Sequence, residues 1–542
     1  MEHIAPVNCI APHPRQTNAD VTHRNSTSSK GAATFALRGD PPLAKDGMSE
    51  DREWAPDGAQ LSRRGQPPLT LSSDEMRRLG YRVVDEVIAH METQRRQRVS
   101  TVHTRAALAS ALGPLIEDPT PVEAVMQLVR GEVLEAITQV DHPRFFAFVP
   151  GPGNFVGTMA DTLAAGFNIF AGHWLAGSGP AAVELQTIEW LCRECGLPET
   201  AGGLFVSGGS MANLTALATA RRVTLGGPDA GAVAYCSRQT HSSLAKGLRV
   251  IGFTADQVRT VDTDDGLRLS TDALERAIAT DQAAGRRPFC VIANAGTTNT
   301  GAVDPLDRVA DICAAHGMWM HVDGAYGAAA VLTPAGRRVL TGMERADSIT
   351  FDPHKWLFQP FEIGCVLVRD VRHLRLAFTV HADDHGEYLE DVTRIVGDEM
   401  VFYDHGVQLT RSFRALKLWM TLRVFGVRAM RDAIGYGITL AEETERRLRA
   451  DDRFEVATPA QLGIVTFVPR HDGLTTDQVN AWVKRTVDAV LADGFAMLTS
   501  TTVFDRHVLR MCTINPQTTV QDLRETLDCI ARAAASTRPV PA

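Results

Sequence analysis

The stretch SITFDPHKW, residues 348–356, decides the fold class of this chain. Its apolar first half predicts a short strand that ends at Pro353, and Lys355 follows directly. Functional groups of open α/β sheets collect at the carboxyl ends of the strands. A lysine after a strand is usually a solvated surface residue, so the segments around it must show whether Lys355 has a chemical role.

The same pattern extends over residues 180–370, where short apolar runs alternate with helical segments. The apolar runs are GLFVSGG, AVAYCS, FCVIANAG, MWMHVDGA and CVLVRD. Strands that are apolar on both faces indicate a mostly parallel sheet covered by helices, which is an α/β fold. After a long helical stretch to about residue 450, GIVTFVPR and HVLRMCTI read as strands with helices between and after them. They predict a small α+β C-terminal domain.

A chain of 542 residues is expected to hold two or three domains. Residues 1–68 lack apolar periodicity and predict a disordered extension. We expect an N-terminal helical segment at 69–145, a large domain at 146–425 and the small domain at 426–542. The first helix can be capped by Ser72 or Ser73, and it carries an apolar stripe of Met76, Leu79, Val83, Val84 and Val87.

Composition excludes several classes of function. The net charge of −9 argues against nucleic acid or an anionic membrane as partner. No apolar run approaches the ~18 residues of a membrane span, and the N-terminus lacks a secretory signal, so we expect a cytoplasmic protein. Nine cysteines argue against a disulfide framework. Cys192 and Cys195 form a CxxC pair without a second pair, which favours helix packing over a metal site.

The segment HVDGAYG, residues 321–327, places Asp323 at the end of a buried strand. A buried carboxylate is costly unless a cation pairs with it. A protonated pyridine nitrogen is such a cation, and the ion pair keeps the ring an electron sink. The alternative is a structural role for Asp323 as a helix cap.

In FVSGGSMANLTAL, residues 205–217, a strand runs through Gly208, Gly209 and Ser210 into a helix. Glycines let the backbone approach a ligand, and the amides of a helix N-terminus bind phosphate. An ordinary glycine turn with a serine cap is the alternative. The segment GPGNFVG at 151–157 has the wrong spacing for a dinucleotide site.

Two histidine-containing segments remain. His241 follows another strand, and its imidazole could stack on a flat aromatic cofactor, although a structural histidine is the more frequent case. The segment HADDH, residues 381–385, has the letters of a metal site in a polar stretch that favours a solvated loop. We therefore predict no metal.

Taken together, the chain resembles the group II decarboxylases that depend on pyridoxal 5′-phosphate (PLP), which have the aspartate-aminotransferase-like fold called fold type I. The similarity extends over roughly residues 70–535 and is closest to the aromatic-L-amino-acid decarboxylase type. The motifs that carry it are HPRFFAFVPGPGNFVG, GSGPAAVELQTIEWL, FVSGGSMANLTAL, YCSRQTHSSLAKG, NAGTTNTGAVDP, WMHVDGAYG, ADSITFDPHKW and LTRSFRALKLW.

The resemblance implies a role for each matching residue. Lys355 would hold PLP as a Schiff base, Asp323 would pair with its ring nitrogen, and His241 would stack on the ring. The remaining positions expected to contact the cofactor are Gly209, Ser210, Met211, Thr298, Ala325, Asp352 and His354. Asp352 stands where some members have Asn beside the phosphate, and an Asp there can donate a hydrogen bond to phosphate only when it is protonated.

The family also implies the reaction, which is loss of CO₂ from an L-amino acid followed by protonation at Cα. A tyrosine on a mobile loop supplies that proton; Tyr388 is the candidate here and Tyr403 its rival. Because active sites of this fold usually lie at a dimer interface, we expect a homodimer in which the N-terminal helices wrap the partner.

The substrate is expected to be aromatic. This rests on the resemblance and on the FFAF segment, Phe145–Phe148, which could equally be a core strand. Thr410 lies where plant relatives separate indole from phenol substrates, and a threonine there decides nothing. The alternatives are an aldehyde-forming branch of the family, a decarboxylase for glutamate or 2,4-diaminobutyrate, and a catalytically silent binding protein.

Overall fold

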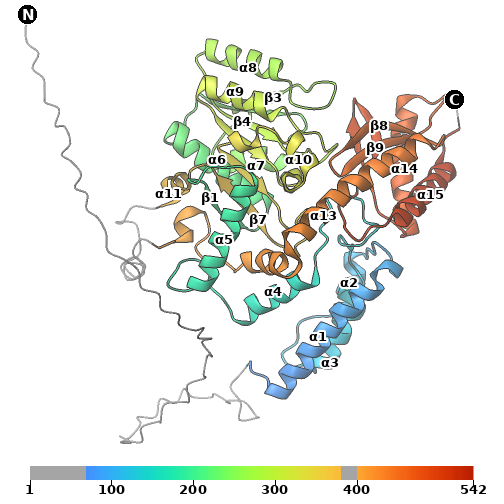
Figure 1. Cartoon of the computed structure of the whole chain (residues 1–542). Coiled ribbons are helices and arrows are strands. Elements are labelled where there is room, and N and C mark those ends of the chain that lie inside the picture. The colour runs from blue at the N-terminus through green and yellow to red at the C-terminus, as the bar shows by residue number, and fades with distance from the viewer. Residues whose placement is uncertain (1–68, 380–398, 541–542) are drawn as a thin grey trace, which may run out of the picture. The chain divides into compact units, whose positions relative to one another are not determined.

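The structure is a computed structural model that describes residues 69–379 and 399–540. Residues Glu75–Ala542 form one compact unit. Its larger sheet has seven strands in the order β1-β7-β6-β5-β4-β2-β3 (Figure 1). Their bounds are β1 Gly202–Val206, β2 Ala232–Ser237, β3 Val258–Val261, β4 Arg287–Asn294, β5 Trp319–Asp323, β6 Ser348–Phe351 and β7 Gly364–Val368. The six apolar runs that predicted strands are all strands of this sheet.

Six of the seven strands run in one direction. The strands β2, β3, β4, β5 and β6 pair in parallel, whereas β7 is antiparallel to both β6 and β1. The reversed strand β7 therefore leaves β1 parallel to the rest, and the carboxyl ends of β1, β2, β4, β5 and β6 lie on the same edge. The expected α/β fold with a mostly parallel sheet is confirmed.

Helices cover both faces because consecutive residues of the strands are apolar and point to opposite sides of the sheet. On one face, Ala232 and Ala234 of β2 pack with α6 (Gly209–Leu225) and α7 (Ser242–Val250). On the other, Val233 and Tyr235 pack with α5 (Ser178–Glu194), α8 (Thr271–Ala283) and α9 (Leu306–His316). The sheet is thus buried on both sides, as its apolar strands require.

The C-terminal part of the chain has an α+β structure with its own sheet, as predicted. It has a four-stranded antiparallel sheet in the order β10-β11-β9-β8. The elements are β8 Phe454–Gln461, β9 Ile464–Pro469, α14 Thr476–Asp493, β10 Thr499–Val503, β11 Arg506–Cys512 and α15 Val520–Thr537. The long helix α13 (Ala415–Arg449) precedes them and is interrupted at Gly426, where φ is 81°. This interruption lies at the predicted start of the small domain.

The N-terminal helices differ from the rest in burial. The first, α1 (Ser73–Thr93), has no buried residue within this chain, and Met76 and Val83 of its apolar stripe are 54% and 41% exposed. The next helices are α2 (Arg105–Leu112) and α3 (Val122–Leu128), with α4 (Phe155–Gly166) after them. Leu79, Val84 and Val87 of the stripe are partly buried in the described chain, so the stripe is only partly covered.

Several sequence features prove to be packing features. Phe145 and Phe146 are buried in apolar clusters, and Phe146 packs in the core of the small domain. Cys192 and Cys195 lie at the end of α5 in the main core, and the described residues hold no metal-binding cluster. In the part of the chain that is described, no helix is both apolar and long enough to cross a bilayer.

Candidate active site

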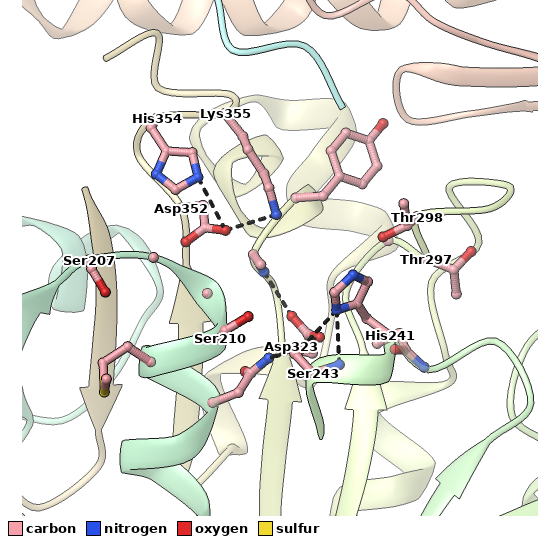
Figure 2. A pocket seen from close by; sticks show the side chains of 18 residues that line it. Ser207, Ser210, His241, Ser243, Thr297, Thr298, Asp323, Asp352, His354 and Lys355 are labelled. Carbon is pink, nitrogen blue, oxygen red and sulfur yellow. Dashed lines mark hydrogen bonds and ion pairs between the residues drawn. The ribbon is translucent and has the colours of Figure 1, made fainter. Parts of the chain in front are cut away.

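A cavity of about 330 Å³ lies where the carboxyl ends of the parallel strands meet (Figure 2). The ends of β1, β2, β4, β5 and β6 each contribute residues to its wall, as the sequence led us to expect. All ten residues predicted to contact a cofactor line it, namely Gly209, Ser210, Met211, His241, Thr298, Asp323, Ala325, Asp352, His354 and Lys355. Residues separated by almost 150 positions in the sequence therefore form one site.

Lys355 reaches the cavity from the turn that follows β6. Its Nζ lies 2.8 Å from Asp352 Oδ2, and His354 Nε2 is 3.7 Å from the same oxygen. Burial by itself would lower the pKa of Lys355, but the carboxylates of Asp352 and Asp323 outweigh it, and the net direction is upward. Lys355 is therefore an ammonium ion at neutral pH and must lose a proton before it can act as a nucleophile.

Asp323 is the last residue of β5, and it is only 8% exposed. Burial raises the pKa of its carboxyl group, while Lys355, the backbone amide of Ala325 and His241 oppose that rise. The Ala325 amide donates to Asp323 Oδ1 at 3.2 Å, and Asn213 Nδ2 donates to Oδ2 at 3.4 Å. The carboxylate is thus directed into the cavity with donors behind it (Figure 2).

Gly208 and Gly209, at the start of α6, form a narrow glycine cradle after the end of β1. A Cβ atom on Gly209 would lie 2.7 Å from Asp352 Oδ2 and 3.1 Å from the Cβ of Ala325. No larger residue fits there without displacing its neighbours. Because the first amides of a helix have no partner inside the helix, Gly209 and Ser210 present donors suited to an anion such as phosphate.

His241 is the N-cap residue of α7, directly after β2. Its Nδ1 accepts from the backbone amide of Ser243 at 3.2 Å and lies 2.9 Å from Ser243 Oγ. The cap holds the imidazole over the cavity, on the side opposite to the glycine cradle (Figure 2). A planar ligand between Ala325 and His241 would have a methyl group on one face and an aromatic ring on the other.

The tyrosine candidates and the remaining motif residues lie elsewhere. Tyr388 and the HADDH segment fall outside the described residues. Tyr403 lies on a short 3-10 helix, Phe402–His405, where its ring meets that of His173 edge-on at 5.9 Å, and it is not part of the cavity wall. Thr410 is exposed and also lies outside that wall.

Sequence reasoning missed several residues of the wall, among them Asn213, Ser243, Asn294 and Tyr326. Asn294 is held by the buried carboxylate of Asp304, whose Oδ2 accepts from the Asn294 side chain at 2.8 Å. Burial raises the pKa of Asp304 to about 6. Asn294 and Asp304 lie ten positions apart in the motif NAGTTNTGAVDP, but no sequence pattern showed that their side chains meet.

Arg510 is a second omission. It lies on β11, is 3% exposed, and its Nε donates to the carbonyl oxygen of Thr298 at 2.8 Å. Its Nη1 and Nη2 atoms are buried and make no hydrogen bond to the described residues. The sequence feature that could have identified Arg510 is its position inside the apolar run HVLRMCTI, because a charge in a buried strand requires a partner.

These residues fit PLP. The glycine cradle leaves space for a ligand at a position where a larger side chain would clash with its neighbours, and the amides of the cradle suit a phosphate. The buried carboxylate of Asp323 matches a cationic ring nitrogen, and Lys355 supplies an amine for an aldehyde.

Comparison with known proteins agrees with the geometry. Residues 113–470 match the pyridoxal-dependent decarboxylase conserved domain. The aromatic-L-amino-acid decarboxylase of Bacillus atrophaeus is 47% identical over 458 residues, which are 84% of this chain and 94% of that protein. A phenylacetaldehyde synthase of Arabidopsis thaliana is 31% identical, over 86% of this chain and 97% of its own length.

Solved structures show the same relationship. The Oryza sativa TDC crystallised with PLP and tryptamine superimposes with a TM-score of 0.82 at 28% identity, over 88% of this chain and all of that one. The family match extends over more than half of the chain. This chain therefore belongs to the pyridoxal-dependent decarboxylases, enzymes whose cofactor is pyridoxal 5′-phosphate.

Proposed function

We propose that the protein converts an aromatic L-amino acid into the corresponding amine and CO₂. The observation that carries the proposal is a cavity in which Lys355, Asp323 and His241 converge, in a chain 47% identical to an aromatic-L-amino-acid decarboxylase. The cofactor, when bound, withdraws electrons from the substrate Cα and so makes loss of the carboxylate feasible. The protein must bind, orient and supply protons.

Lys355 would hold the cofactor covalently through Nζ, and Asp323 would hold a proton on the ring nitrogen. The second role follows from charge, because burial at the end of β5 disfavours the carboxylate of Asp323 unless a cation pairs with it. Ala325 and His241 would enclose the ring. Orientation between two fixed faces restricts rotation and favours cleavage of a single bond.

The phosphate would lie in the glycine cradle. Gly209, Ser210 and Met211 supply the first turn of α6, and Thr298 lies on the opposite wall. His354 and Asp352 border the same end of the cavity. Asp352 is paired with Lys355 in this structure, so covalent capture of the cofactor by that lysine would break the ion pair.

Protonation at Cα needs an acid that reaches the substrate only after the site has closed. We assign this role to Tyr388, which follows the lysine in a polar stretch and is succeeded by Leu389, as in the family's loop. Tyr403 is the less favoured candidate, because its ring packs against His173 outside the cavity wall.

We further propose that the protein is a cytoplasmic homodimer. Large apolar side chains of the N-terminal segment are exposed in the single chain, including Tyr81, Leu115 and Ile116 at 69%, 104% and 63%. Exposed apolar area of this kind marks an interface. The described cysteines are buried and unpaired, which suits a reducing compartment. Light scattering should give twice the chain mass, and Val83→Glu should lower it.

Release of CO₂ from the common amino acids and from dihydroxyphenylalanine tests the proposal, with amine and aldehyde measured in each case. Aromatic substrates should react fastest and yield amine. Aldehyde as the main product would favour the second candidate, an aldehyde synthase, which the similarity to the phenylacetaldehyde synthase supports. Fastest turnover of glutamate or 2,4-diaminobutyrate would contradict the aromatic assignment.

A further inference from the structure

A continuous chain of buried hydrogen bonds lies behind the cavity, on the strands and helices that form its floor. Trp319 Nε1 donates to Ser348 Oγ at 2.8 Å, and this oxygen lies 2.9 Å from His321 Nδ1. His321 Nε2 lies 3.0 Å from Asn213 Oδ1. All four residues are at most 3% exposed, so water cannot replace any of these contacts.

The chain divides at Asn213, whose amide nitrogen carries two hydrogens. One is donated to Ser243 Oγ at 3.0 Å, and the other to Asp323 Oδ2 at 3.4 Å, the longest contact of the set. Ser243 Oγ in turn lies 2.9 Å from His241 Nδ1. Asn213 thus connects the floor to two groups of the cavity wall, the carboxylate of Asp323 and the imidazole of His241, which lie beside each other (Figure 2).

The chemistry of the two ends determines the direction of every hydrogen bond. An indole N–H can only donate, and the backbone amide of Ser243 fixes His241 Nδ1 as an acceptor, so Ser243 Oγ donates to it and accepts from Asn213. Ser348 therefore accepts from Trp319 and donates to His321 Nδ1, so His321 carries its proton on Nε2 and donates to Asn213 Oδ1. Thr350 Oγ1 donates to the same oxygen at 2.7 Å.

The opposite direction leaves donors without acceptors. If Oδ2 of Asp323 carried a proton and donated it to Asn213, Asn213 would have to turn its amide nitrogen toward His321 and Thr350. Ser348 would then accept from both Trp319 and His321, and its own hydrogen would point at no acceptor of the chain. Buried groups left without a partner are costly, so Oδ2 of Asp323 must accept from Asn213; Oδ1 accepts from the Ala325 amide, and the two contacts together favour the anion.

We propose that Asn213 is a positioning residue that holds Asp323 as a carboxylate and His241 with its proton on Nε2. This inference deepens the proposed function and rests on it. Without such support, burial would favour the neutral acid, because desolvation raises the pKa of Asp323. The relay itself stays uncharged, since burial lowers the pKa of His321 to about 3.

The test compares two cofactors, PLP and its 1-deaza analogue, in which carbon replaces the ring nitrogen. Both have the aldehyde and the phosphate, so both can be captured by Lys355, but only PLP offers a nitrogen to Asp323. The ratio of the two dissociation constants, measured by visible absorbance with purified full-length protein, isolates the contact at the nitrogen. In the wild type, PLP should bind more tightly.

Asn213→Leu should reduce that preference by about tenfold or more, because a hydrogen bond to a charged group is lost. It should also weaken the visible circular dichroism of each bound cofactor, since His241 loses its orientation. His321→Gln retains an N–H donor and an oxygen acceptor, and should keep most of the preference. Thr219→Val is the matched control, because Thr219 is buried in the same helix but bonds only to the carbonyl of Thr215.

Each outcome of these measurements supports or contradicts the positioning role of Asn213. An unchanged ratio in Asn213→Leu, or an equal loss of affinity for both cofactors, would overturn the positioning role, since a structural defect does not distinguish carbon from nitrogen. If Asn213→Leu does not fold, Ser348→Ala should lower the ratio about threefold, and no change there would count equally against the proposal. Wild-type protein that captures neither cofactor would instead overturn the proposed function.

Discussion

The ion pair between Lys355 and Asp352 makes a prediction about how the protein captures its cofactor. The two charged atoms are 2.8 Å apart, and the Asp352 side chain is 3% exposed. The pair keeps Lys355 protonated and therefore unreactive toward an aldehyde. Asp352→Asn preserves the shape of the side chain and removes the charge, so the free amine should become accessible at lower pH.

Coulomb's law with an effective dielectric constant of about 20 assigns roughly 6 kcal/mol to unit charges at this separation. Desolvation of the two groups cancels much of this energy. Asp323 remains as a second carboxylate near the lysine and limits the effect further. If the ion pair stabilises the ammonium form of Lys355 by only about 1.4 kcal/mol, Asp352→Asn still raises the fraction of free amine at neutral pH about tenfold.

The assay mixes cofactor-free protein with PLP across a range of pH and follows the visible absorbance. Wild-type capture should still accelerate above pH 10, because the pKa of Lys355 lies above its ordinary 10.5. Asp352→Asn should reach its plateau at lower pH. Pyridoxal, which lacks the phosphate, serves as control, since relief of repulsion between Asp352 and phosphate cannot affect it. Identical pH dependence in the two proteins would refute the reasoning.

Three further predictions concern the site and its support. Lys355→Ala should abolish covalent capture and nearly all CO₂ release, and substantial turnover by the purified variant would contradict the assignment of this lysine. Tyr388→Phe should still release CO₂ but shift the product from amine toward aldehyde, with O₂ as the oxidant; unchanged amine production would transfer the test to Tyr403. Lowering the pH from 7 to 5 should cost about 2 kcal/mol of folding stability through His321 alone, because the unfolded imidazole binds a proton near pH 6.5 whereas burial lowers the folded pKa to about 3. Urea unfolding of His321→Gln should lack this part of the loss, and equal acid sensitivity in both proteins would exclude it.

The sequence alone was sufficient to predict the interior strands of both sheets. Strands such as β2 and β5 are buried along their whole length, so they appear as unbroken apolar runs. The strands that were not predicted are β3, β8 and β10, and each lies at a sheet edge. Their burial is partial, as in Thr499–Val503, and half-exposed strands carry polar residues that resemble loops.

The cofactor contacts were also accessible from the sequence, because each is adjacent to the end of an apolar run. A lysine after β6 and an aspartate ending β5 meet in space whenever parallel strands are neighbours. The Lys355–Asp352 pair is a local consequence of the same turn. The roles assigned to these residues remain predictions for the experiments above.

Only the tertiary structure revealed the groups behind the site. Asn213 looks like an ordinary helix residue, and His321 like one letter of a buried strand. Their contacts join α6 to β5 and β6, which are more than 100 positions apart in the sequence. Hydrogen-bond partners at that distance depend on how helices and strands pack, and packing leaves no periodic signal in the chain. The apolar stripe of α1 shows the same limit, because the sequence identifies the residues of the stripe but not the surface that packs against them.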